Sequence, residues 1–168
     1  MAPSAVQPAA APAAESAYGP WPQHAVLVVD DEEGMRSFLT RALKPAVGLV
    51  EAAPSAEHAQ ELFNRFHFDV VILDHALPGK SGVEWLEELR AAGATCDVIL
   101  ITAFADLDTA ISAVRAGACD FILKPFRLDQ MMNAVQRCFE RQSLTRENFV
   151  LRRTLDERAG IEGIVGQS

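Results

Sequence analysis

The sequence predicts an α/β fold in which a doubly wound, five-stranded parallel sheet carries helices on both faces. Short apolar runs alternate along the chain with amphipathic segments, which is typical of repeated strand–helix units. The runs are apolar throughout, as in parallel strands that are covered on both sides. A chain of 168 residues has room for one domain with extensions.

The N-terminal half of this fold is expected to hold two strand–helix units. A first strand covers residues 25–29, and a helix over 33–44 follows, because its apolar residues recur at helical spacing up to Pro45. A second, weaker strand covers 47–52. The next helix is expected to start after a cap at Ser55.

The third strand, residues 70–74, delivers Asp74 to a loop rich in Pro and Gly. The helix after this loop is expected to bury one stripe of apolar residues, Val83, Leu86 and Leu89. Trp85 lies off that stripe, so we expect it to be only partly buried.

The C-terminal half is expected to complete the sheet with strands over 98–102 and 119–123. The helix between them is expected to turn its apolar residues inward, namely Leu107, Ile111 and Val114. A last helix begins near Arg127 and continues to about Ala159. The complete pattern matches a flavodoxin-like plan with strand order 2-1-3-4-5 and an extended C-terminal helix.

Polar residues gather where the strands end. Because all strands of a parallel sheet share one carboxyl edge, the following side chains are expected together: Asp30, Asp31, Asp74, Thr102 and Lys124. Adjacent carboxylates repel one another, and a hard cation such as Mg²⁺ relieves this. A lysine and a hydroxyl suit a tetrahedral anion. We therefore expect phosphoryl chemistry with Asp74 as the nucleophile.

Four motifs give the chain a resemblance to a known family over about residues 25–142. They are Val28-Val29-Asp30-Asp31-Glu32, Ile72-Leu73-Asp74 with Leu77-Pro78-Gly79 and Gly82, Ile101-Thr102-Ala103, and Phe121-Ile122-Leu123-Lys124-Pro125-Phe126. In this order and spacing they resemble a bacterial two-component response-regulator receiver domain.

The resemblance implies roles for the acidic residues. Asp74 would accept a phosphoryl group from the phosphohistidine of a sensor kinase. Asp31 and Asp74 would bind Mg²⁺ together with the backbone carbonyl of Ala76, and Asp30 would act mainly through metal-bound water.

The resemblance also implies a switch. Lys124 would pair with the phosphate, Thr102 would move its hydroxyl onto a phosphoryl oxygen, and Phe121 would swing inward behind it. The face built from the fourth helix, fifth strand and fifth helix would be the output surface.

Three residues depart from the family pattern. Lys80 stands where the family often has an apolar residue, and Ala76 and Phe104 offer no polar group to guide an attacking water. We hypothesise slow self-dephosphorylation for this reason.

The extensions divide into three parts. Residues 1–22 are rich in Ala and Pro and predict a disordered tail before the receiver domain of residues 23–142. Residues 143–159 predict a helical linker, and residues 160–168 resemble the start of the ATPase domain of sigma-54-dependent (NtrC-type) transcription activators, here cut short. A short coiled-coil seam would dimerise the linker through Leu144, Asn148, Leu151 and Leu155. A solvated helix with incidental leucines explains the same spacing equally well.

Composition limits the partners. A net charge of −8 without a basic cluster argues against direct contact with nucleic acid, and no apolar run is long enough to span a membrane. Cys96, Cys119 and Cys138 have neither metal-type nor redox-type spacing, so we interpret them as reduced thiols of a cytoplasmic protein.

These observations favour a signalling switch over an enzyme. The expected partners are a histidine kinase, the chain's own output domain and a second copy of the chain. One alternative is a stand-alone receiver that acts as a phosphorelay intermediate or protein-binding switch. An aspartate-nucleophile phosphatase is a further alternative, which would turn over small phosphate esters.

Overall fold

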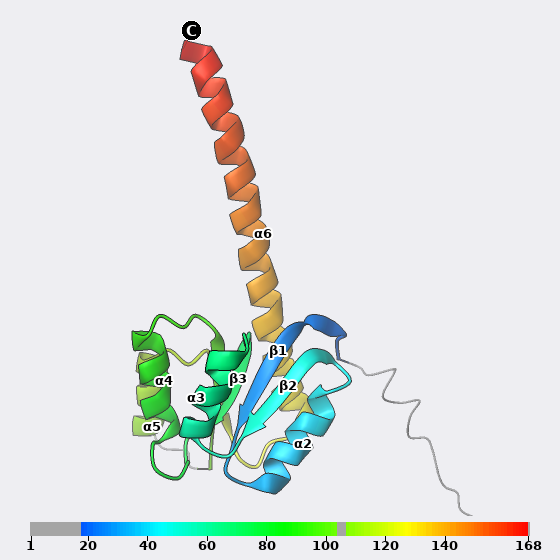
Figure 1. The fold of residues 1–168 in the computed structure, drawn as a ribbon, viewed down its shortest axis with the longest axis vertical. Helices are drawn as coiled ribbons and strands as arrows, with labels where there is room; N and C mark the ends of the chain where they lie inside the picture. The colour runs from blue at the N-terminus through cyan, green and yellow to red at the C-terminus, as the bar shows by residue number, and fades with distance from the viewer. Residues whose placement is uncertain (1–17, 104–106, 168) are drawn as a thin grey trace, which may run out of the picture.

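A computed structural model of the protein describes residues 18–103 and 107–167. All neighbouring strands run parallel in the order β2-β1-β3-β4-β5, which confirms the predicted fold class (Figure 1). The strands are β1 (Trp21–Val29), β2 (Val47–Ala53), β3 (Val70–Asp74), β4 (Asp97–Thr102) and β5 (Asp120–Leu123). The helices are α2 (Glu33–Leu43), α3 (Ala56–Arg65), α4 (Gly82–Ala91), α5 (Leu107–Ala116) and α6 (Leu128–Gln167).

The sheet is buried on both faces. Helices α3, α4 and α5 pack on one face against side chains that include Leu27 and Leu73. Helices α2 and α6 pack on the other, against side chains that include Val28 and Ile72. Successive strand residues point to opposite faces, so each strand needs apolar residues at every position.

Strand β1 begins four residues before the start that the sequence predicted. Trp21 and Pro22, which were assigned to the N-terminal tail, belong to this strand. The Trp21 ring meets the edge of the Phe139 ring of α6 at a centroid distance of 5.0 Å, and its backbone N–H bonds to the carbonyl oxygen of Ala46. The tail prediction for residues 1–17 lies outside the described residues.

The prediction for the inner face of α5 was wrong. Leu107, Ile111 and Val114 are exposed, with Leu107 and Val114 more than 70% accessible. The buried residues of this helix are Ala113 and Ala116, which belong to the core cluster on this face of the sheet.

Trp85 of α4 is fully buried, contrary to the expectation of partial exposure. Its ring packs edge-on against Phe63, and its indole N–H donates a 2.9 Å hydrogen bond to Oε1 of Gln60. The partner on α3 satisfies the one polar atom of the ring, which is what a buried indole requires.

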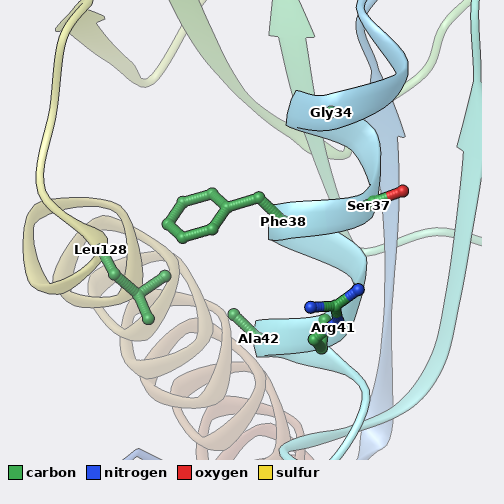
Figure 2. Close-up of a pocket in the computed structure, with 6 residues that line it drawn as sticks. All are labelled: Gly34, Ser37, Phe38, Arg41, Ala42 and Leu128. Carbon is green, nitrogen blue, oxygen red and sulfur yellow. The ribbon is translucent and has the colours of Figure 1, made fainter.

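Helices α2 and α6 border a shallow groove of about 340 Å³. Phe38 lies over this groove beside Leu128 and is 44% exposed, although it shares the apolar stripe of α2 with the buried Leu39 (Figure 2).

Helix α6 starts in the domain and continues well beyond it as one unbroken helix (Figure 1). The predicted helix end near Ala159 is therefore wrong, because α6 passes through Gly160 and Gly163. Leu144, Leu151 and Leu155 are about 60% exposed, and the side chain of Asn148 lies outside the described ones. Within the described residues, no helix combines the length and hydrophobicity that crossing a membrane requires.

Candidate functional site

The carboxyl edge of the sheet collects the polar side chains that the sequence placed there. Asp74 is the last residue of β3 and Thr102 the last of β4, while Asp30 directly follows β1 and Lys124 directly follows β5. Asp30, Asp74 and Thr102 are almost completely buried. Backbone pairing continues past the strand ends, since the N–H of Lys124 donates to the carbonyl oxygen of Thr102.

Lys124 joins the carboxylates of two strands. Its Nζ lies 3.2 Å from Oδ2 of Asp30 and 3.2 Å from Oδ2 of Asp74, with Oε1 of Glu32 at 3.4 Å. Burial alone would lower the pKa of Lys124, but attraction to Asp74 and Asp30 holds that pKa above its usual value. The ammonium therefore stays charged and offsets part of the repulsion between the two carboxylates.

Asp74 has the most perturbed carboxyl group of the site. Burial and repulsion from Asp30 raise the pKa of Asp74 to about 6, while Lys124 and a hydrogen bond from the backbone N–H of Ala76 act in the opposite direction. That hydrogen bond reaches Oδ1 at 3.2 Å. Any additional positive charge nearby would stabilise the ionised form of this carboxyl group.

Three carboxylates form a cluster that suits a hard cation. One oxygen each from Asp30, Asp31 and Asp74 lies within 4.8 Å of the others, and the Asp31 side chain is exposed while the other two are buried. An all-oxygen set with few carboxylates and access to water fits Mg²⁺. Burial and, after it, repulsion from Asp30 raise the pKa of Asp74, and a cation bound here would favour its ionised form.

The loop after Asp74 is fixed by the start of α4. Ser81 Oγ accepts from the N–H of Glu84, and the Glu84 carboxylate accepts from the N–H of Ser81, so the helix starts with a capping box. Gly82 lies so close to the Asp74 backbone that an added Cβ would collide with the Asp74 carbonyl oxygen. Lys80, which the sequence left unexplained, makes a 2.7 Å ion pair with Glu88 of α4.

Two contributors were not identified from the sequence. Glu32 contacts Lys124, and the N–H of Glu32 donates a 2.8 Å hydrogen bond to Oδ1 of Asp30. Arg36 donates through Nη1 to the carbonyl oxygen of Asp30 at 2.8 Å. The run of acids before α2 offered a signal for Glu32. The sequence offered no comparable signal for Arg36, since basic residues are common in helices for other reasons.

The two switch candidates occupy different environments. Thr102 is buried at the end of β4 beside the site. Phe121 is half-buried at the start of β5 and packs against the core under α3, α4 and α5. Ala76 is exposed in the loop beyond Asp74. Phe104 lies outside the described residues.

The fold and the site define a class: a doubly wound α/β domain with an acidic cluster and one lysine at the carboxyl edge of its sheet. Residues 26–136 match the family model described as the response regulator receiver domain. The chain belongs to this family.

Similar proteins agree with this assignment. The regulatory protein AtoC of Escherichia coli is 38% identical over 122 residues, or 73% of this chain. The C4-dicarboxylate transport transcriptional regulatory protein DctD of Pseudomonas aeruginosa is 35% identical over 147 residues, or 87% of the chain. These matches cover only 26% and 32% of the relatives, so the chain spans about a quarter to a third of their length.

Solved structures show the same architecture. A receiver domain of a Francisella response regulator aligns with a TM-score of 0.66 at 26% identity, covering 71% of this chain and 99% of that one. NtrX of Brucella abortus, solved with ADP, aligns with a TM-score of 0.68 at 31% identity, covering 74% of this chain and 29% of NtrX.

Proposed function

We propose that the protein takes a phosphoryl group from a sensor histidine kinase onto Asp74 in a Mg²⁺-dependent reaction in the cytoplasm, and thereby switches an output domain. One observation carries the proposal: Lys124 bridges Asp30 and Asp74 at 3.2 Å each, with the third carboxylate of Asp31 nearby. This arrangement suits a site that must hold an anion next to its own carboxylates.

In the proposed reaction a carboxylate oxygen of Asp74 attacks phosphorus, the P–N bond of the phosphohistidine breaks, and the imidazole leaves with that electron pair. Lys124 stays charged and pairs with the incoming phosphoryl oxygens. Asp31, Asp74 and the Ala76 carbonyl would hold Mg²⁺, with Asp30 acting through a bound water. The cation would supply charge neutralisation, which is the main requirement of phosphoryl transfer.

The switch would pass from the site to the outer surface. Thr102 would turn its hydroxyl onto the phosphoryl group, and Phe121 would follow inward. Exposed apolar side chains lie on the neighbouring α5–β5 surface, at Leu107, Ile111, Val114 and Leu123. Exposed apolar residues suit an output surface, because a partner can bury them when it binds.

The output is proposed to be transcription activation of the sigma-54-dependent type, with this chain as the N-terminal receiver. Two features support this: the match to the transcriptional regulator DctD extends over 147 residues, and α6 leads away from the receiver as a linker would. ATP hydrolysis by the complete protein, stimulated by phosphorylation, is the measurement that tests it.

The central experiment is labelling with acetyl phosphate and Mg²⁺, followed by intact-protein mass spectrometry. We expect one phosphoryl group per chain, no labelling after chelation of the metal, and none in Asp74→Asn. The control Asp129→Asn removes an exposed carboxylate paired with Arg127 and should label like the wild type. Labelling of Asp74→Asn would contradict the proposal. Steady phosphate release from many esters would favour the phosphatase instead.

A further inference from the structure

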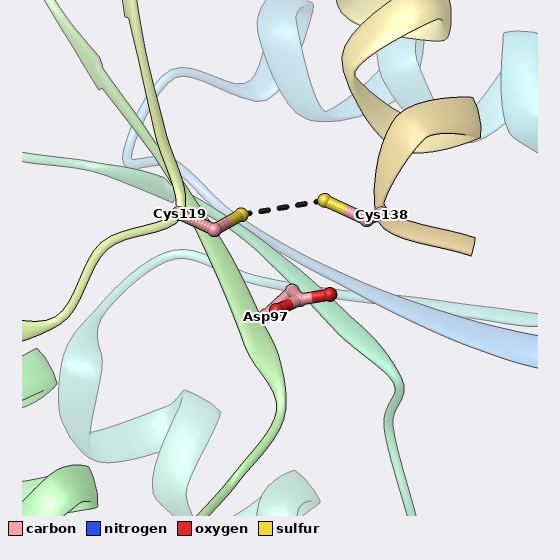
Figure 3. A group of neighbouring side chains, drawn as sticks. All are labelled: Asp97, Cys119 and Cys138. Atoms are coloured by element: carbon pink, nitrogen blue, oxygen red, sulfur yellow. Dashed lines mark hydrogen bonds between the residues drawn. The ribbon is translucent and has the colours of Figure 1, made fainter. Parts of the chain in front are cut away.

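Two cysteines far apart in the sequence lie in contact at the amino edge of the sheet. Sγ of Cys119 is 3.3 Å from Sγ of Cys138 (Figure 3). Cys119 directly precedes β5, and its N–H donates to the carbonyl oxygen of Val98. Cys138 lies on the buried face of α6 and is only 2% exposed. The backbone of Cys119 is therefore tied to β4 by a hydrogen bond, and the backbone of Cys138 is part of α6.

Polar side chains surround the pair and tie α6 to the sheet. Arg141 approaches Sγ of Cys138 at 3.9 Å and makes a 3.1 Å ion pair with Oδ1 of Asp97. Gln142 donates to Oδ2 of Asp97 at 2.8 Å and to the carbonyl oxygen of Asp69 at 2.9 Å. The two thiols thus lie where α6 leaves the domain.

The two thiols differ in acidity. The hydrogen bond from Cys138 lowers the pKa of Cys119, and Arg141 contributes in the same direction. The same hydrogen bond and burial raise the pKa of Cys138. A thiolate is the reactive form of cysteine, so Cys119 is suited to attack an oxidant and Cys138 to resolve the product. Cys119 is also the more accessible of the two.

We propose that Cys119 and Cys138 form a reversible intramolecular disulfide when the protein meets a peroxide-class oxidant. The Cys119 thiolate attacks a peroxide oxygen, the O–O bond breaks, and the leaving hydroxide takes up a proton to form water. The resulting sulfenic acid is attacked by Cys138, which loses its proton as the S–S bond forms and a second water leaves. Two thiols lose two electrons, the peroxide gains two, and a dithiol reductant reverses the change.

Formation of the disulfide requires only a small movement of the two sulfur atoms. A disulfide has an S–S bond of about 2.05 Å, so the sulfur atoms must approach by about 1.2 Å from the 3.3 Å that separates them. Rotation of a cysteine side chain about its Cα–Cβ bond moves sulfur by such amounts without displacing the backbone.

A metal site is the competing interpretation, because a carboxylate oxygen of Asp97 lies within 4.8 Å of both sulfur atoms. The surroundings favour the disulfide. Both oxygens of Asp97 already accept from Arg141 and Gln142, and the guanidinium group near the sulfur atoms repels a cation. A zinc ion would have to displace these bonds as well as bind.

The bond would act on α6 independently of Asp74. The phosphoryl site lies at the carboxyl edge of the sheet, whereas these cysteines lie at the amino edge. A disulfide between them would link β5 covalently to the segment of α6 that leaves the domain. It would close a loop of about 20 residues and so oppose separation of α6 from the sheet.

The test is oxidation of the whole chain with hydrogen peroxide, followed by thiol counting and peptide mapping without reductant. We expect the three thiols to fall to one, with a 119–138 crosslink that dithiothreitol removes. Cys96→Ser is the matched control and should still lose two thiols. In Cys138→Ser, dimedone should trap a sulfenic acid on Cys119.

Stability provides an independent readout. Oxidised wild type should melt about 5–10 °C above the reduced protein, and peroxide-treated Cys138→Ser should show no rise. Survival of all three thiols, crosslinks only between chains, or an unchanged melting temperature after crosslinking would overturn the proposal. Stoichiometric Zn²⁺ bound by the reduced protein and lost in both Cys119→Ser and Cys138→Ser would overturn it in favour of a metal site.

Discussion

Ionisation of the Asp74 carboxyl group at neutral pH lowers the stability of the fold. Its pKa in the folded chain is about 6, against 3.8 for an ordinary aspartate. This group therefore contributes stability fully below pH 3.8, and that contribution is lost as the pH rises through 6.

The first prediction concerns this loss of stability. Without metal at pH 8, we expect Asp74→Asn to raise the free energy of unfolding by about 1 to 3 kcal/mol, because a neutral amide avoids both the burial of a charge and the repulsion from Asp30. The gain should shrink as the pH falls toward 4. Urea unfolding at several pH values measures it, and a gain that grows on acidification would contradict the assignment.

The pKa of Asp74 also predicts how phosphorylation depends on pH. Only the ionised carboxyl group attacks phosphorus, so labelling by acetyl phosphate at low Mg²⁺ should decline as the pH falls through about 6. Saturating Mg²⁺ should move the midpoint to lower pH, because the cation favours the ionised form. A midpoint that Mg²⁺ leaves unchanged would argue against metal binding by Asp74.

The third prediction concerns the effect of Ala76 on the lifetime of the acyl phosphate. Its methyl group is exposed beside Asp74 and offers no hydrogen bond to an attacking water. We expect Ala76→Asn to shorten the lifetime severalfold, measured by loss of label after removal of the phosphodonor. Ala76→Val adds bulk without a polar group and serves as the control. An unchanged lifetime in Ala76→Asn would exclude the explanation.

Some contacts between single residues were predictable from the sequence, and others were not. Asp30, Asp74 and Lys124 could be placed together because strand ends of a parallel sheet share an edge. Cys119 and Cys138 could not, since nineteen positions separate them and only the packing of α6 on the sheet brings them into contact.

At the scale of elements, helix α4 illustrates how packing tolerances shape the site. Gly82 begins this helix against the backbone of Asp74. We expect Gly82→Ala to reduce the unfolding free energy by more than about 2 kcal/mol and to slow labelling, because the loop after Asp74 must shift.

Gly34 supplies the matched control for this prediction. It lies in α2 with open space around the position of an added Cβ. Gly34→Ala should therefore stabilise the protein by up to about 1 kcal/mol, since alanine is the better helix former. Equal effects of the two substitutions on chemical denaturation would contradict the proposed contact at Gly82.

Helix α5 shows a limit of periodicity. Spacing correctly grouped Leu107, Ile111 and Val114 as neighbours on one side of a helix, but spacing does not reveal which side meets the sheet. In the structure the buried side of α5 is formed by Ala113 and Ala116 instead. A stripe of large apolar residues was thus mistaken for core.

At the scale of the whole molecule, the two covered faces were predictable from the alternation of apolar runs and amphipathic segments, and the strand order from the match to the flavodoxin-like plan. The length of α6 was not, because three glycines after Ala159 suggested an end that the helix does not have. Local propensity costs about 1 kcal/mol per glycine, which a long helix tolerates.

The last prediction concerns assembly. If Leu144, Leu151 and Leu155 form a seam between two copies, beryllofluoride with Mg²⁺ should change the molar mass measured by light scattering. Replacing all three leucines by asparagine should leave a monomer under both conditions, while labelling at Asp74 continues. An unchanged monomer in the wild type, with and without beryllofluoride, would favour the solvated helix.

The continuity of α6 has a consequence for anything attached beyond it. Each residue of an α-helix advances about 1.5 Å and turns about 100°, so the 40 residues of α6 span roughly 60 Å with a defined angular phase. Inserting two residues after Leu144 would turn the distal part by about 200°, whereas inserting seven would nearly restore its direction. Helix α6 therefore sets both the distance and the orientation, relative to the receiver domain, of any segment attached to its distal end.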